Sequence, residues 1–259
     1  MIIKSTPFHI PNFSPWPILL SIWIFNLFVG IILYLHYNII IIIILSSILV
    51  VDILKHWFND IIIESLYQGH HTLKVQKLLK FAFLLFIISE IMLFFSFFWS
   101  FFHFSLVPNI HLGNNWPPLY ITPINPFGIP LFNTIILISS GITLTISHFY
   151  LISNNNLSIV YLNITICFGI LFSLLQLFEY YNNPITIACS VYGSLFYLLT
   201  GFHGFHVIVG TIFLIVCSYR LINHHFTNNH HVLIEVSSWY WHFVDIVWLF
   251  LYIILYIWI

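Results

Sequence analysis

Seven long apolar runs determine what this chain can fold into. They cover approximately residues 18–34, 39–58, 78–104, 130–152, 157–180, 191–219 and 234–257. A helix of about 20 residues, rising 1.5 Å per residue, crosses the hydrocarbon core of a bilayer. The segments between the runs contain prolines, glycines and asparagines that end helices. We therefore predict an all-α, polytopic integral membrane protein with seven transmembrane helices, of which the third and sixth are longer than a bilayer requires.

The scarcity of charge excludes several other classes of protein. Charged residues make up 5% of the 259 positions and hydrophobic residues 61%. A chain of this composition has no polar surface to cover a water-soluble core. Its net charge of −1 and its lack of a basic face argue against a nucleic-acid partner. The three cysteines form no Cys-x-x-Cys pair, so neither a disulfide framework nor a thiolate metal site is indicated.

The basic residues predict how the chain is oriented. One precedes the first helix, four flank the connection between the second and third helices, and one opens the connection before the last helix. They are Lys4, Lys55, Lys74, Lys77, Lys80 and Arg220. Positive charge gathers on the side that is not translocated. We expect the N-terminus on that side, which is the matrix in a mitochondrion or the cytoplasm in a bacterium. The odd number of helices then places the C-terminus on the opposite side, which in a mitochondrion faces the intermembrane space. The tryptophans near helix ends are expected to be interfacial anchors: Trp16, Trp57, Trp116, Trp239, Trp241 and Trp258.

Glu90 is the acid that interrupts the third apolar run. It lies about ten residues into KFAFLLFIISEIMLFFSFFWSFF, or about 15 Å from the basic end. A charged carboxylate at mid-membrane depth costs at least about 3 kcal/mol, so such residues are usually functional. The alternative is a neutral glutamic acid that is hydrogen-bonded within the bundle. We favour a functional carboxyl group.

A second polar group, ESLYQGHHT at residues 64–72, lies beside the lysines at the basic interface. Hydrogen-bond donors and positive charge at headgroup depth can bind a phospholipid phosphate. An ordinary capped loop, in which Thr72 starts the next helix, explains the same residues equally well.

Histidines and acids are concentrated near the C-terminus. Four histidines, His224, His225, His230 and His231, share one short connection, and headgroup or subunit contacts are the preferred interpretation over a metal site. His242 and Asp245 are three residues apart on one helical face, so we expect them to form a structural pair. His203 and His206 lie among glycines in an apolar helix. We interpret them as packing histidines that bond across helices rather than as metal or haem ligands.

Eight segments together resemble the cytochrome c oxidase subunit III family. They occur in collinear order as SPWP at 14–17, ESLYQGHHT at 64–72, LFIISE at 85–90, FFW at 97–99, WPP at 116–118, LLQLFEYY at 174–181, VYGSLFYLLTGFHGFHVIVG at 191–210 and WYWHFVDIVWLFLY at 239–252. The resemblance runs from near the N-terminus to the C-terminus. The last two segments are the most specific.

The resemblance implies a single transmembrane domain whose first two helices, in residues 1–72, splay from the five in residues 73–259 and form a V-shaped lipid cleft. It implies no metal in this chain, with haem a, haem a3 and copper held by partner subunits. Subunit I is the implied main contact, beside subunit II, accessory subunits and a respiratory supercomplex.

Several residues match lipid contacts of the family, and the implied lipids are phospholipids including cardiolipin, which Arg220 would contact. The matching positions are Trp57, Glu64, Ser65, His71, Lys80, Arg220, His230 and His231. Glu90 matches a buried, reactive carboxyl group. The chain departs from the family at four positions. Asn59 and Ile63 stand where many members have arginine, and Phe81 stands where tyrosine is common. Lys80 replaces an arginine, and lysine lacks the bidentate fork with which arginine binds phosphate.

We therefore expect a subunit of a mitochondrial cytochrome c oxidase, which reduces oxygen to water and pumps protons, that has no catalytic residue of its own. It would bind lipids, stabilise subunit I and tune proton uptake or oxygen access. The near absence of alanine indicates an AT-rich gene, which favours synthesis within the organelle. The alternatives are subunit III of a bacterial cytochrome c or quinol oxidase, or a proton-coupled carrier built around Glu90 and Asp245.

Overall fold

A computed structural model describes residues 9, 11–108, 110, 113–118, 121–228 and 230–258. Within this part of the chain, seven α-helices are long and apolar enough to cross a membrane, which confirms the predicted class. They are α1 (Trp16–Tyr37), α2 (Ile41–Leu66), α3 (Leu73–Leu106), α4 (Ile129–Ile152), α5 (Leu157–Asn182), α6 (Val191–Ile222) and α7 (Val232–Leu251), which continues into the π-helical segment η2 (Tyr252–Ile257). The third and sixth helices are the longest, with 34 and 32 residues, as predicted.

The chain divides into two compact units, residues 1–79 and 80–259, and the boundary falls within α3. The first unit contains α1, α2 and the start of α3. The second contains the rest of α3, helices α4 to α7 and η2. Lys4 lies outside the described residues.

In the first unit, α1 and α2 form a helical hairpin. Asn38 ends α1 in a left-handed conformation with φ 57°, which asparagine tolerates better than most residues. Near this turn, Gly30 lets the backbone of α2 approach, since a Cβ at this position would lie 3.1 Å from a backbone nitrogen of α2. At the far end of the hairpin, Trp16 Nε1 donates a hydrogen bond of 2.5 Å to Asp60 Oδ2. Both ends of the hairpin are thus fixed by specific contacts.

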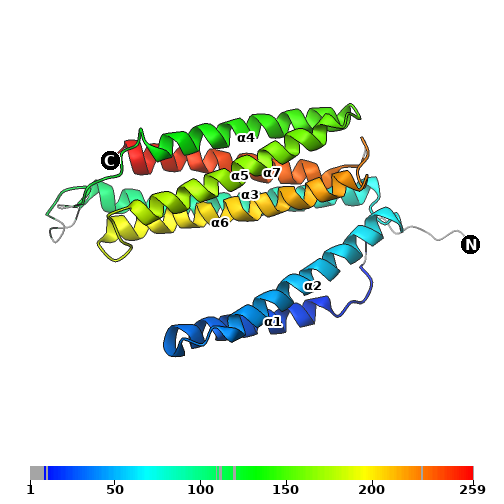
Figure 1. The fold of residues 1–259 in the computed structure, drawn as a ribbon, viewed down its shortest axis with the longest axis horizontal. Helices are drawn as coiled ribbons and strands as arrows, with labels where there is room; N and C mark the ends of the chain where they lie inside the picture. Colours follow the sequence, from blue (N-terminus) through cyan, green and yellow to red (C-terminus); the bar gives the residue numbers. More distant parts are fainter. Residues whose placement is uncertain are drawn as a thin grey trace, which may run out of the picture. The chain divides into compact units, whose positions relative to one another are not determined.

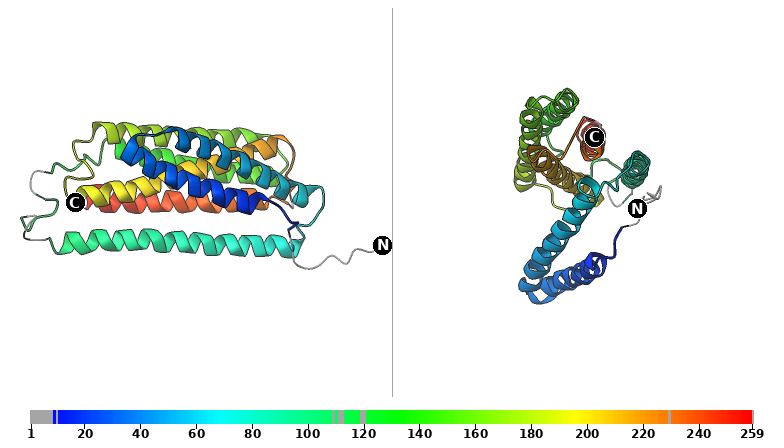
Figure 2. Two further views of the ribbon diagram at one scale, coloured as in Figure 1. Left: turned by 90° about the horizontal axis from the view of Figure 1, so that it is seen from below. Right: turned by 90° about the vertical axis from the view of Figure 1, so that its right-hand side faces the viewer.

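In the second unit, helices α4, α5, α6 and α7 form a four-helix bundle. Close contacts join α4 to α5, α5 to α6, α6 to α7 and α7 back to α4. Figure 1 shows these helices side by side with α3, and the end-on view in Figure 2 shows α7 beside α3, α4 and α6. Fully buried residues of this bundle include Leu144, Leu162 and Leu199.

Trp241 in α7 occupies the centre of this bundle. Its side chain is 0% exposed, and its Nε1 donates a hydrogen bond of 2.9 Å to Ser140 Oγ in α4. A Cβ at Gly169 of α5 would lie 2.7 Å from the indole ring, and one at Gly210 of α6 would lie 3.0 Å from it. All four helices therefore meet around one ring. The prediction that Trp241 is an interfacial anchor was wrong, because two glycines on other helices make a buried space for it.

Helix α3 packs against the bundle through its side chains. Phe83 and Phe94 contact rings of α6 and α7, at centroid distances of 6.2 Å to Phe213 and 6.1 Å to Phe243. Large aromatic side chains keep the backbones apart while filling the space between them. This spacing leaves room for the polar and apolar features described below.

The outward faces of the helices are apolar in both units. Large exposed side chains include Phe25 in α1, Ile48 in α2, Phe95 in α3 and Phe149 in α4. Water-soluble proteins rarely expose such extensive apolar patches. These faces are suited to contact with lipid chains.

Candidate functional site

Glu90 of α3 faces His206 of α6. The carboxyl Oε2 lies 2.9 Å from His206 Nε2, and the other ring nitrogen, Nδ1, lies 2.7 Å from the carbonyl oxygen of Phe202. A carbonyl only accepts hydrogen bonds, so Nδ1 carries a hydrogen. The contact between Nε2 and the carboxyl group then requires a second proton, held by either the imidazole or the carboxyl. In both arrangements the pair is neutral as a whole.

Aromatic rings surround this neutral pair. Phe94 lies edge-on to His206 at 5.2 Å between ring centroids, and Tyr240 stacks on it at 6.3 Å. The Glu90 side chain is 19% exposed and that of His206 is 9% exposed. A proton shared within a hydrogen-bonded pair removes much of the cost of placing a carboxyl group in apolar surroundings. The pair can therefore hold, and exchange, one proton at membrane depth.

His203 lies in the same helix but in different surroundings. Its ring is fully buried and packs against Phe172 at 5.7 Å and Trp248 at 5.1 Å. Neither of its ring nitrogens has a hydrogen-bond partner among the described residues. The two histidines of α6 thus do not bond to each other, and only His206 bonds across to another helix.

His242 and Asp245 lie close together on one face of α7. His242 Nδ1 is 3.9 Å from Asp245 Oδ2, which is an ion-pair distance but too long for a hydrogen bond. A Cβ at Gly141 of α4 would lie 2.7 Å from the same carboxyl oxygen. The glycine therefore makes room for the acid between the two helices.

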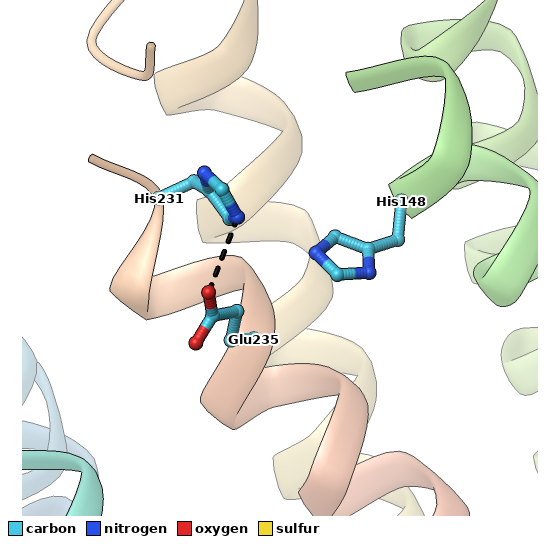
Figure 3. Close-up of side chains that lie close together, drawn as sticks. All are labelled: His148, His231 and Glu235. Atoms are coloured by element: carbon cyan, nitrogen blue, oxygen red, sulfur yellow. Dashed lines mark ion pairs between the residues drawn. The ribbon is translucent and has the colours of Figure 1, made fainter. Parts of the chain in front are cut away.

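An ionisable cluster lies where α7 begins. Glu235 pairs through Oε2 with Lys80 Nζ of α3, and its Oε1 lies 3.2 Å from His231 Nε2. Figure 3 shows the ring of His148, at the end of α4, pointing toward His231 and Glu235. The centroids of the two imidazole rings are 5.4 Å apart. His148 could not be identified from the sequence, because a single histidine near a helix end carries no motif.

Four of the predicted lipid contacts lie in the first unit. Glu64 Oε2 is 3.0 Å from His9 Nε2, whose ring lies 5.4 Å from that of His71, and Ser65 Oγ donates to a carbonyl of its own helix. Trp57 and Glu64 line a pocket of about 200 Å³. The pocket is lined by Pro11, Asn12, Phe13, Ser14, Trp16, Trp57, Asp60, Ile61, Ile63, Glu64 and Gln68. Among the described residues, this lining has two carboxyl groups and neither lysine nor arginine, so it favours a cationic group over a phosphate.

The remaining predicted lipid contacts lie in the second unit, where Lys80 and His231 belong to the cluster around Glu235. Arg220 is buried at the end of α6, with its guanidinium carbon 4.7 Å from the centroid of the Phe226 ring. His230 exchanges backbone hydrogen bonds with Thr227 in the following loop. Burial lowers the pKa of His225, and the Arg220 guanidinium lowers it further. The Arg220 guanidinium therefore disfavours a second positive charge on His225.

An apolar groove lies between α3 and α7. It has a volume of about 520 Å³. Its walls are Ile87, Ile91, Phe94, Phe95 and Phe98 of α3 and Trp239, His242, Phe243, Ile246, Val247 and Phe250 of α7. Phe94 belongs both to this groove and to the surroundings of His206. The groove thus comes to within one side chain of the neutral pair.

A buried carboxyl group on α5 also could not be identified from the sequence. Glu179 of α5 is 4% exposed, and its Oε1 accepts a hydrogen bond of 2.7 Å from the Tyr256 hydroxyl. Its other oxygen has no partner among the described residues. Although Glu179 is part of a segment noted in the sequence, nothing local indicates the tyrosine 77 positions away.

Replacement of Tyr256 by phenylalanine is expected to destabilise the second unit by about 1–3 kcal/mol, because it leaves a buried carboxyl group without its hydrogen bond. Tyr252→Phe is the matched control, because Tyr252 lies in the same π-helical segment as Tyr256. Its hydroxyl donates a longer hydrogen bond, of 3.2 Å, to the carbonyl oxygen of Pro126. Unfolding in mixed detergent micelles, followed by circular dichroism, measures both. Equal losses in the two variants would contradict a special role for the Glu179 bond.

The fold and these sites define a class: a helical, multi-pass membrane protein with buried polar pairs and no soluble domain among its described residues. Comparison with known proteins is more specific. The family model for cytochrome c oxidase subunit III matches residues 6–259. The chain belongs to the cytochrome c oxidase subunit III family.

Curated relatives agree over almost their whole length. The chain is 51% identical to "Cytochrome c oxidase subunit 3" of Pisaster ochraceus over 253 residues, which cover 97% of each chain. It is 47% identical to the protein of the same name from Paracentrotus lividus, over 100% of this chain and 99% of the relative. The Anopheles quadrimaculatus protein is 49% identical over 97% of each chain. These matches confirm the predicted membership of a terminal oxidase complex, an oxidoreductase, and decide against a membrane carrier.

Proposed function

We propose that this subunit supports oxygen reduction in a mitochondrial cytochrome c oxidase by holding a proton-exchanging pair and lipids beside the redox subunits. Haem a, haem a3 and copper belong to partner subunits, and this chain provides no redox centre. Its main contact is with subunit I. The observation that carries the proposal is the neutral Glu90–His206 pair, which lies within apolar helices one side chain away from an apolar groove.

The pair supplies chemistry that an apolar helix otherwise lacks. Because one proton is shared between the imidazole and the carboxyl group, it can move between them without creating net charge in the membrane. When the pair itself gains or loses a proton, its net charge changes by one unit, and the electric field around it changes accordingly. Through this change the subunit tunes proton uptake by its partner.

Lipid binding is the second part of the proposal. The groove between α3 and α7 is wide and apolar enough for an acyl chain, and it also offers oxygen an apolar route inward. The interfacial residues predicted from the family that lie outside the cluster around Glu235, including Arg220 for cardiolipin, would contact the headgroups. These contacts stabilise the complex with subunit I, subunit II and accessory subunits, and within a respiratory supercomplex.

The proposed location is the mitochondrial inner membrane, with the N-terminus on the matrix side and the gene in the organelle. The contact between Lys80 and Glu235 supports part of this orientation, because it brings the basic start of α3 to the start of α7. Arg220, at the end of α6, precedes α7 by one short loop. Lys80 of α3 and Arg220 of α6 thus both lie toward the end of the second unit at which α7 begins, which supports the proposed orientation.

Glu90→Gln tests the proposal in the assembled oxidase. Glutamine keeps the size of the side chain and can donate to His206 Nε2, but it cannot exchange a proton. We expect normal amounts of assembled complex and a several-fold fall in the number of turnovers completed before activity declines. Native gel electrophoresis measures assembly, and continuous oxygen consumption measures sustained turnover.

Ser89→Ala is the matched control. Ser89 is exposed beside Glu90 in α3 and bonds only to a carbonyl of its own helix, so its loss is expected to leave sustained turnover unchanged. Unchanged turnover over many cycles in Glu90→Gln would show that the carboxyl group has a purely structural role.

A further inference from the structure

We propose that His148, His231 and Glu235 form a binding site for a divalent transition-metal ion of the zinc type. This inference does not rest on the proposed proton or lipid roles. One ligand atom from each residue lies within 4.8 Å of the other two. Figure 3 shows the three side chains converging from the end of α4 and the first turn of α7.

The hydrogen bonding of His231 prepares one ligand. Its Nδ1 lies 3.1 Å from the Thr227 carbonyl oxygen, so Nδ1 carries the hydrogen and Nε2 presents a lone pair. This Nε2 faces Glu235 Oε1 at 3.2 Å, and two acceptors at that distance require either an added proton or a cation between them. Metal-bound histidines commonly donate their second N–H to a backbone carbonyl in this way.

His148 provides the second imidazole. Its Nε2 is buried and has no hydrogen-bond partner among the described residues. A buried polar atom without a partner is costly, and coordination of a cation would satisfy it. The site therefore combines one pre-oriented imidazole, one unsatisfied imidazole and one carboxylate.

The donor set decides which ligand is favoured. Two imidazoles and a carboxylate suit Zn²⁺ better than Mg²⁺ or Ca²⁺, which prefer oxygen ligands. The Glu235 carboxylate inside the cluster disfavours a phosphate. Zinc–ligand distances of about 2.0–2.2 Å require the three side chains to move closer together, and the fourth position is left for water.

Lys80 limits the affinity of this site. Its ammonium group pairs with Glu235 Oε2, which leaves Oε1 for the metal but places a positive charge beside a dication. Removing this charge, while keeping the three ligands, is expected to strengthen zinc binding. This opposite effect separates metal coordination from a merely structural role of the cluster.

The test uses the purified oxidase that contains this chain, treated with a chelator and dialysed against Zn²⁺ alone. Zinc content is measured by mass spectrometry and its ligands by X-ray absorption. We expect His148→Gln to lose one zinc per chain or to bind it at least about tenfold more weakly, and Lys80→Met to bind it several-fold more tightly. His225→Gln, in the nearby loop but outside the cluster, is expected to bind as the unaltered protein does.

Equal zinc content and affinity in the unaltered protein and His148→Gln would overturn the proposal. So would an unchanged affinity in Lys80→Met, which keeps the test decisive if the His148 variant fails to assemble. The proposal would also be overturned if the X-ray absorption spectrum of the bound zinc showed no nitrogen ligand that is lost in His148→Gln.

Discussion

Replacing Trp241 by alanine is expected to destabilise the second unit by about 3 kcal/mol, the lower end of the cost of truncating a buried tryptophan. The lower end applies because helices in lipid associate through packing rather than through removal of apolar surface from water. The variant loses the contacts of the indole ring with Gly169 and Gly210, and the hydrogen bond to Ser140. Detergent-induced unfolding, followed by circular dichroism, measures the loss.

Trp99→Ala is the control for the size of the deleted side chain. Trp99 is 61% exposed in α3, and its ring stacks on the neighbouring His103. We expect this replacement to change the free energy of unfolding by less than about 1 kcal/mol. A similar loss in both variants would contradict a central role for Trp241.

Gly169→Ala is expected to destabilise the same unit by about 3 kcal/mol, at the upper end of the cost of overpacking. The added Cβ would lie 2.3 Å from Thr211 Cγ2 and 2.7 Å from the Trp241 ring, so both α6 and α7 must shift. The same unfolding measurement applies, together with the amount of assembled oxidase in the membrane.

Gly204→Ala provides the matched comparison. Apart from the adjacent residues and the surrounding backbone of α6, no atom of the described residues lies within 4 Å of the position that a Cβ would occupy there. Alanine has the higher helix propensity, so this variant is expected to be as stable as the unaltered chain, or more so. If Gly169→Ala proves equally harmless, the close packing around Trp241 cannot be as described.

The helices could be predicted from the sequence because the signals that define them are local. Run length and the surrounding prolines and asparagines placed the seven helices, and the two longest runs became α3 and α6. The environment of Trp241 could not be predicted in this way. It depends on Gly169 and Gly210, which lie on two other helices, and a single sequence does not reveal which faces meet.

The polar sites show the same limit. His242 and Asp245 could be brought together from their spacing of three residues on one helix. Glu90 and His206 were both noted, but their contact spans 116 positions and depends on how α3 packs. His148 and Tyr256 carried no signal at all, since each gains its meaning from a partner on another helix.

The apolar outward faces of both units also determine how such a chain can be made. Side chains such as Phe25 and Phe149 would meet water during any period between synthesis and insertion. Exposed apolar surface of this extent drives aggregation at cellular concentrations. Ribosomes that make this chain therefore need to work at the membrane, so that each hydrophobic segment leaves the exit tunnel directly into lipid.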